Sequence, residues 1–155
     1  MNITIRRATI NDLEAICDLS QQLFDYEQQF TDEFNMSWSR AIEGKKFFTK
    51  KLKGRKSFIL LAQDGNKLAG YILIALESPA WREYIPIADV ANLSIAPDYR
   101  GKGIGTRLMQ QAKKMAIKRG AKRMSVSALT INARVLKFYE KQGFKDFNIT
   151  LIMKP

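Results

Sequence analysis

The chain has no histidine and only 1 cysteine among its 155 residues. Without histidine, Ser-His-Asp triads and histidine general bases are excluded, so acid–base chemistry must use carboxylate, tyrosine, lysine, cysteine or water. One cysteine cannot form an intramolecular disulfide, and it cannot build a metal cluster without histidine, so we predict no metal site. Cys17 lies beside an apolar stripe and is expected to be a buried small hydrophobe.

Long hydrophobic runs are also missing. No apolar run approaches the ~18 residues of a membrane span, and residues 1–7 lack the apolar core of a signal peptide. We therefore expect a cytoplasmic protein with no membrane partner. Apolar residues make up 46% and charged residues 26%, as in ordinary globular proteins, and 155 residues fit a single domain spanning 1–155.

Acidic residues are scarce beside basic ones, with 15 against 26 and a net charge of +11. The imbalance is uneven, because residues 1–35 carry a net charge of −5 and the remainder carries +16. A basic body suits a polyphosphate and an acidic end suits a cation, although both can be solvated faces. An alternative reading is a basic RNA-binding domain. Its candidate phosphate contacts are Lys113, Lys114, Lys118, Arg119, Lys122 and Arg123. Known base-stacking signatures are missing, so a nucleic-acid partner is not expected.

Hydrophobic periodicity and turn residues predict interleaved strands and helices. Strands are expected at 3–6, 57–62, 68–76, 87–95, 123–128 and 144–153, and helices at about 11–29, 38–52, 103–119 and 133–142. This order predicts an α/β (α+β) fold with a mixed sheet.

A glycine-rich turn stands between the strand at 87–95 and the helix that follows. It reads Arg100-Gly101-Lys102-Gly103-Ile104-Gly105-Thr106. Because glycines at alternate positions have no side chains, they leave the backbone N–H groups exposed at the helix start, where the helix dipole favours a phosphate. A Walker A loop is excluded because Thr106-Arg107 follows Gly105, and the Rossmann pattern is excluded because no third glycine stands at 106–108.

A second group of residues lies downstream, where Asn132 precedes Tyr139 by seven positions and Gly143-Phe144 follows. Asn132 is a natural helix N-cap, and seven residues are close to two helical turns, so both side chains share one face. Each residue also has a plain structural explanation, as a cap and as a core aromatic.

The two segments together resemble the GNAT acetyltransferase family, whose motif A reads Arg/Gln-x-x-Gly-x-Gly/Ala and is matched here by Arg100, Gly103 and Gly105. The resemblance is good over residues 87–155. It implies a mixed, mostly antiparallel central sheet flanked by about four helices. It also implies an N-acetyltransferase that uses acetyl-CoA as cosubstrate and transfers the acetyl group directly to an amine in a ternary complex.

The same resemblance implies roles for individual residues. The backbone of Leu93, Ser94 and Ile95 would hold the pantetheine arm, and residues 100–106 would hold the pyrophosphate. Asn132 would touch the pantetheine end, and Tyr139 would act as general acid toward the leaving sulfur. A GNAT-like domain that binds acyl-CoA without turning it over is the remaining alternative.

The general base stays open. Asp89 shares strand parity with Leu93 and Ile95 if no bulge intervenes, and Asn92 stands where many relatives carry an acid. Glu77, at the end of the preceding strand, is the other candidate.

The acceptor is expected between the first two helices and the loop before residue 87, and is an amine-bearing small molecule or peptide. That region contributes aromatic and acidic side chains, which suit a cationic amine. These are Tyr26, Phe30, Phe34, Trp38, Trp81 and Tyr84 with Glu27, Asp32, Glu33 and Glu83. The aromatics would equally suit a homodimer surface or the core.

Overall fold

The computed structural model describes residues 1–155 and places five strands in one sheet, in the order β1-β2-β3-β4-β5. The strands are β1 (Ile3–Arg7), β2 (Ser57–Asp64), β3 (Lys67–Glu77), β4 (Ile87–Ile95) and β5 (Arg123–Val126). The first four pair antiparallel, whereas β4 and β5 pair parallel. The mixed, mostly antiparallel sheet predicted from the sequence is confirmed.

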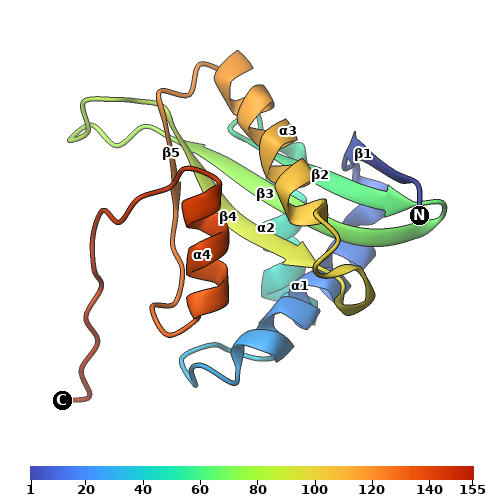
Figure 1. Cartoon of the computed structure of the whole chain (residues 1–155), viewed down its shortest axis with the longest axis horizontal. Coiled ribbons are helices and arrows are strands. Elements are labelled where there is room, and N and C mark those ends of the chain that lie inside the picture. The colour runs from blue at the N-terminus through green and yellow to red at the C-terminus, as the bar shows by residue number, and fades with distance from the viewer.

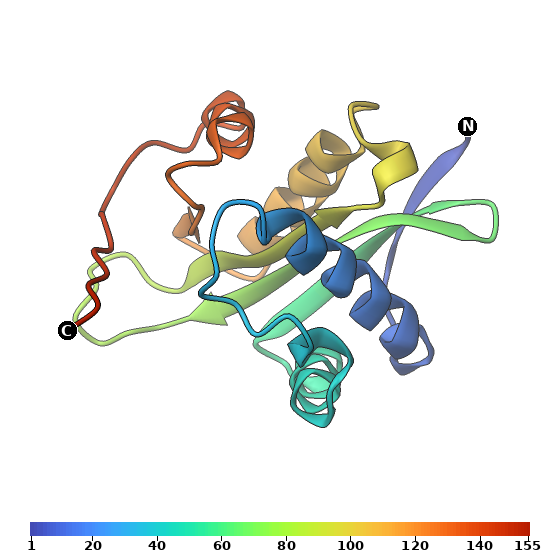
Figure 2. The ribbon, with the colours of Figure 1, turned by 90° about the horizontal axis from the view of Figure 1, so that it is seen from below.

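Four α-helices flank this sheet, as predicted. They are α1 (Leu13–Glu27), α2 (Ile42–Lys53), α3 (Ile104–Lys118) and α4 (Ala133–Lys141), and short 3-10 turns precede the first three: η1 (Ile10–Asp12), η2 (Trp38–Arg40) and η3 (Pro97–Tyr99). Helices α1 and α2 cover one face, and α3 covers the other with α4 beside it (Figures 1 and 2). No helix is long and apolar enough to cross a membrane.

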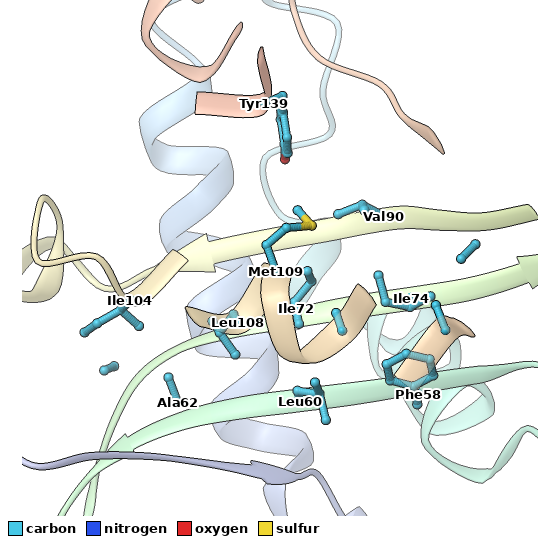
Figure 3. Packing of buried hydrophobic residues seen from close by; sticks show 14 of the residues in the cluster. Phe58, Leu60, Ala62, Ile72, Ile74, Val90, Ile104, Leu108, Met109 and Tyr139 are labelled. Carbon is cyan, nitrogen blue, oxygen red and sulfur yellow. The ribbon is translucent and has the colours of Figure 1, made fainter. Parts of the chain in front are cut away.

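The central strands β2 and β3 are covered on both faces, which explains why they read as continuous apolar runs. Alternate residues go to opposite sides of a strand. Leu60 and Ile72 therefore pack toward α3, as Figure 3 shows, while Leu61 and Tyr71 pack toward α1 and α2. Cys17 is 1% exposed on the α1 side, and burial raises the pKa of its thiol. The prediction of a buried small hydrophobe is confirmed.

Strand β4 carries a bulge at Ala91. Leu73 of β3 pairs with Asn92 and Ile74 pairs with Val90, so Ala91 has no partner. The extra residue reverses the alternation. Ala88 and Val90 face α3 before the bulge, and Leu93 and Ile95 face it afterwards.

The two parallel strands separate soon after they meet. Their register runs from Ile87 opposite Arg123 to Val90 opposite Val126, and it ends there. From Ala91 to Ile95 the edge of β4 that faces β5 has no strand partner. The sheet therefore contains an open edge between α3 and α4.

The predicted strand at 144–153 is wrong. These residues form no regular structure, and most of them are exposed. Apolar residues alternate at Phe147, Ile149 and Leu151, which favours a strand, but a strand also needs a neighbour. In Figure 1 the segment leaves α4 and runs away from the sheet, so no strand of this chain pairs with it.

Candidate functional site

The turn between η3 and α3 is held open by two glycines in the left-handed region. Gly101 has φ 74° and Gly103 has φ 76°, and a Cβ at either position would meet nothing within 4 Å. Helix α3 begins at Ile104, and its first backbone hydrogen bond runs from the Arg107 N–H to the carbonyl of the N-cap residue Gly103, at 3.1 Å. The backbone N–H groups of residues 101–106 are therefore free donors at the positive end of the helix dipole.

Charged side chains flank this turn. The Nε of Arg100 donates to the Ile95 carbonyl at 3.0 Å, and its guanidinium lies 4.7 Å from the centroid of the Tyr26 ring. The Lys102 ammonium lies 5.5 Å from the centroid of the Tyr99 ring. Arg100 thus joins the end of β4 to the end of α1 and keeps positive charge beside the free N–H groups.

Three other residues of the predicted phosphate loop have distinct environments. Ile104 is 1% exposed and its side chain belongs to the core, so only its backbone faces the turn. A Cβ at Gly105 would lie 3.5 Å from the Phe138 ring, an ordinary contact. Thr106 accepts a hydrogen bond of 3.3 Å from Gln142 and so joins α3 to α4.

The predicted pantetheine strand lies along the open edge of β4. Leu93 and Ile95 pack against the α3 core, and the Ser94 hydroxyl donates to the Leu19 carbonyl at 2.8 Å. Because all three side chains are engaged elsewhere, only backbone groups remain at the open edge. An unpaired strand edge accepts extended chains that carry amides.

Tyr139 projects from α4 toward Met109 and Val90, as Figure 3 shows, and is 9% exposed. Burial raises the pKa of its hydroxyl, and the charges of Glu27 and Asp89 raise it further. The hydroxyl therefore stays protonated and can act as a hydrogen-bond donor.

Asn132 has a local structural role. It is 3% exposed, and its Oδ1 accepts the Val135 N–H at 3.2 Å, which caps the start of α4. Its side-chain oxygen is thereby engaged within the chain.

The two predicted base candidates lie in different places. The Asp89 Oδ1 accepts a hydrogen bond of 2.8 Å from Ser125 on β5. Without a bulge, Asp89 would share a sheet face with Leu93 and Ile95. The bulge at Ala91 reverses the alternation, so Asp89 lies on the face opposite to Leu93. Glu77 is exposed at the far end of β3, opposite Ile87. The structure brings Asp89, but not Glu77, into the electrostatic environment of Tyr139.

Glu27 is one of the acids expected at the acceptor region, but the sequence did not predict that it lies near Tyr139. It is the last residue of α1, burial raises its pKa, and its charge acts on Tyr139. Periodicity located the end of this helix, but what the end faces depends on tertiary packing. No group of three or more His, Cys, Asp or Glu side chains is arranged to hold a metal ion.

The basic residues considered for RNA are not all free. The Arg119 guanidinium lies 4.8 Å from the centroid of the Phe58 ring and donates to backbone carbonyls of the β2 region. Arg123 lies 4.0 Å from the centroid of the Tyr84 ring. Two of the six candidate phosphate contacts are therefore engaged inside the chain.

Comparison with known proteins places these features in a family. The model of the acetyltransferase (GNAT) family matches residues 16–144, which include the glycine turn, Asn132 and Tyr139. Streptothricin acetyltransferase of Streptomyces lavendulae is 34% identical over 89 residues, or 57% of this chain and 44% of that protein. Spermidine N(1)-acetyltransferase of Thermoplasma acidophilum is 26% identical over 94% of this chain and 89% of its own length.

A solved structure shares the fold. The PaiA N-acetyltransferase from Thermoplasma acidophilum, in complex with coenzyme A, superposes with a TM-score of 0.82 at 24% identity, covering 97% of this chain and 94% of that one. Because the family model spans most of the chain and the fold agrees, this protein belongs to the acetyltransferase (GNAT) family.

Proposed function

We propose that the protein is an acetyl-CoA-dependent N-acetyltransferase that transfers the acetyl group directly to a primary amine while both substrates are bound. The observation that carries the proposal is the left-handed turn at Gly101 and Gly103, which leaves the first N–H groups of α3 free beside the open edge of β4. A pyrophosphate fits the free donors, and an amide-bearing pantetheine arm fits the open edge. The coenzyme A complex of the PaiA relative supports this assignment.

Acetyl-CoA would supply an activated thioester carbonyl. Residues 100–106 would hold its pyrophosphate, and the backbone of residues 93–95 would align the arm and polarise the carbonyl through an N–H group. Alignment of amine and carbonyl is the main contribution that such a site makes to the rate. Asn132, which caps α4, would contact the end of the pantetheine arm.

In the transfer, the amine nitrogen attacks the carbonyl carbon, a C–N bond forms, the C–S bond breaks, and the nitrogen loses a proton. The leaving thiolate gains a proton or a hydrogen bond. Because the pKa of Tyr139 is raised, complete proton transfer from its hydroxyl to a thiol-range group is uphill. Tyr139 would therefore stabilise the leaving thiolate by donating a hydrogen bond to it, and the thiolate would take its proton from solvent on release.

The acceptor is proposed to be a cationic amine. Glu27 and Asp89 both act on Tyr139, and the Tyr26 ring lies at the same end of α1. An ammonium between two carboxylates is electrostatically favoured, and Asp89 or an ordered water would remove its proton. The names of two relatives, which act on spermidine and streptothricin, support an amine-bearing small molecule.

Isothermal titration calorimetry with CoA and acetyl-CoA tests the donor site. We expect micromolar binding to the wild type, and a loss of at least about 100-fold in Gly103→Asp, where a carboxylate would face the phosphates. Gly120→Asp is the matched control, since Gly120 has φ 85° and open space at the other end of α3. Absence of binding to the wild type contradicts the proposal, as does an equal loss in the control.

A thiol-release screen then tests turnover. Polyamines, amino acids, aminoglycosides and peptides are offered with acetyl-CoA, and release above the acceptor-free rate identifies the amine. Tight CoA binding without release for any amine would instead indicate a non-catalytic acyl-CoA-binding domain.

A further inference from the structure

The Arg100 side chain is held by two contacts that leave its terminal nitrogens unused. Its Nε donates to the Ile95 carbonyl at 3.0 Å, and its guanidinium carbon lies 4.7 Å from the centroid of the Tyr26 ring. No hydrogen bond within the chain uses Nη1 or Nη2, and Arg100 forms no ion pair. Because a guanidinium carries donors on all three nitrogens, most of them stay free beside Gly101, the next residue of the turn.

The Tyr26 ring contacts a second aromatic ring as well as the guanidinium. Its centroid lies 5.6 Å from that of Phe30, with 74° between the ring planes. The Phe30 N–H donates to the Glu27 carbonyl at 2.9 Å, so the chain turns back onto the ring directly after α1. Both contacts use the ring, and the hydroxyl of Tyr26 makes no hydrogen bond within the chain. The ring, and not the hydroxyl, is therefore what this position requires.

The last turn of α1 is held to the end of β4 by this arginine. The other polar contact between the two elements runs from the Ser94 hydroxyl to the Leu19 carbonyl at 2.8 Å, and it lies about two turns earlier in the helix. Glu27 directly follows Tyr26, is half-buried and forms no ion pair. The position of this carboxylate at the proposed acceptor site therefore depends on the contact between Tyr26 and Arg100.

We propose that Tyr26 is a positioning residue that links the phosphate site to the acceptor site. Its ring holds the Arg100 guanidinium where it meets the pyrophosphate, and bound pyrophosphate in turn holds the last turn of α1, with Glu27, in place. The proposal rests on the proposed function, since it takes the pyrophosphate of CoA as the ligand of the turn.

Two physical effects support this role. A free arginine side chain loses rotamer freedom when it binds a phosphate, whereas one already held by a ring and a carbonyl loses much less. The coupling also works in reverse, because a contact that strengthens phosphate binding must itself be strengthened by bound phosphate. A tyrosine that only packed at the end of α1 would affect stability without any dependence on Arg100 or on CoA.

Calorimetry with CoA on a double-mutant cycle tests the first half of the link. Tyr26→Leu should weaken CoA binding about 5- to 10-fold, the effect of losing one partly desolvated cation–π contact. In the Arg100→Ala background the same substitution should change the affinity by less than about twofold, since the guanidinium through which it acts is gone. Tyr26→Phe keeps the ring and should bind CoA as the wild type does. Equal losses in both backgrounds overturn the proposal.

Hydrogen exchange at the end of α1, over residues 24–30, tests the second half. Saturating CoA should slow exchange in this segment by at least about threefold in the wild type and in Tyr26→Phe, and by much less in Tyr26→Leu and Arg100→Ala. Arg100→Ala leaves the aromatic ring in place, so it separates loss of the link from local unfolding of the helix end.

The two proposals fail in different ways. Full slowing of exchange in Arg100→Ala overturns the link, as does CoA binding to the wild type with no slowing at all, and both results leave the proposed function standing. Absence of CoA binding to the wild type would contradict the proposed function and the link together.

Discussion

The two helices that flank the open edge of β4 begin in opposite ways. Helix α4 starts at Asn132, whose side chain accepts the Val135 N–H and closes the helix end. Helix α3 starts at Gly103, which has no side chain to cap it and a φ of 76°. Helix α4 thus uses its own side chain to bind an N–H group of its first turn. Helix α3 leaves the N–H groups of its first turn free for a ligand. This difference separates a helix start that is closed by a side-chain cap from one that can bind a ligand.

The largest effect, on CoA affinity, is expected when the N-cap residue of α3, Gly103, is replaced by asparagine, the N-cap residue of α4. Asparagine tolerates the left-handed region better than most residues, so Gly103→Asn should retain the fold. Its side chain would occupy the phosphate space, and loss of charge-assisted hydrogen bonds there should weaken CoA binding about 10- to 100-fold. Calorimetry measures the affinity and urea unfolding measures stability. Unchanged affinity would mean that the free donors of α3 do not hold the phosphates.

Tyr139 sharpens the comparison from the α4 side. Tyr139→Phe keeps the buried ring and removes only the hydroxyl, so CoA affinity should change little while turnover falls about tenfold, the worth of one hydrogen bond to a charged group. Because the pKa of the hydroxyl is raised, the wild-type rate should show no decline from its ionisation up to pH 10. Stopped-flow thiol release with chemistry rate-limiting provides the measurement. An unchanged rate would remove Tyr139 from the mechanism.

Variants of Asn132 test whether this residue only caps α4 or also contacts the pantetheine arm. Asn132→Ala should cost about 1 kcal/mol of stability, whereas Asn132→Asp retains a capping oxygen and should cost much less. If the amide also touches pantetheine, Asn132→Asp restores stability but not CoA affinity. Restoration of both by aspartate would make Asn132 a capping residue only. Chemical unfolding and calorimetry on the same three proteins separate these outcomes.

The smallest effect concerns the start of the first helix, where Asp12 accepts hydrogen bonds from Arg6 at 2.8 Å and from the Thr9 N–H at 2.8 Å. The Arg6 hydrogen bond lowers the pKa of Asp12 to about 2. Because the pKa of Asp12 is lower in the folded protein than in the unfolded chain, its charge stabilises the fold fully at pH values above 3.8, the ordinary pKa. This stabilisation is lost as the pH falls through about 2.

Because the Arg6 side chain is 41% exposed, screening reduces this stabilisation to about 1 kcal/mol or less. Asp12→Asn should therefore destabilise the protein at pH 7, and the gap to wild type should close as pH falls from 4 toward 2. Urea unfolding at pH 7, 4 and 2.5 measures the gap. A difference that does not vary with pH would rule out the charge as its source.

Much of the fold was predictable because its signals are local. The hairpin at Gly65-Asn66, the strand at 87–95 and the four helices follow from periodicity, glycine and caps, all of which act over a few residues. The glycine turn was predictable for the same reason, since the left-handed backbone at Gly101 and Gly103 favours glycine whatever surrounds it.

Tertiary structure decided what local signals cannot carry. The bulge at Ala91 depends on register with β3, and it determines which face Asp89 occupies. The approach of Glu27 to Tyr139 joins two helices that lie more than a hundred residues apart. The C-terminal segment has the alternation of a strand but no neighbour, and a strand exists only where a second chain segment supplies its hydrogen bonds. The sequence thus determined most of the elements and the turn at Gly101 and Gly103, and packing determined which side chains meet beside that turn.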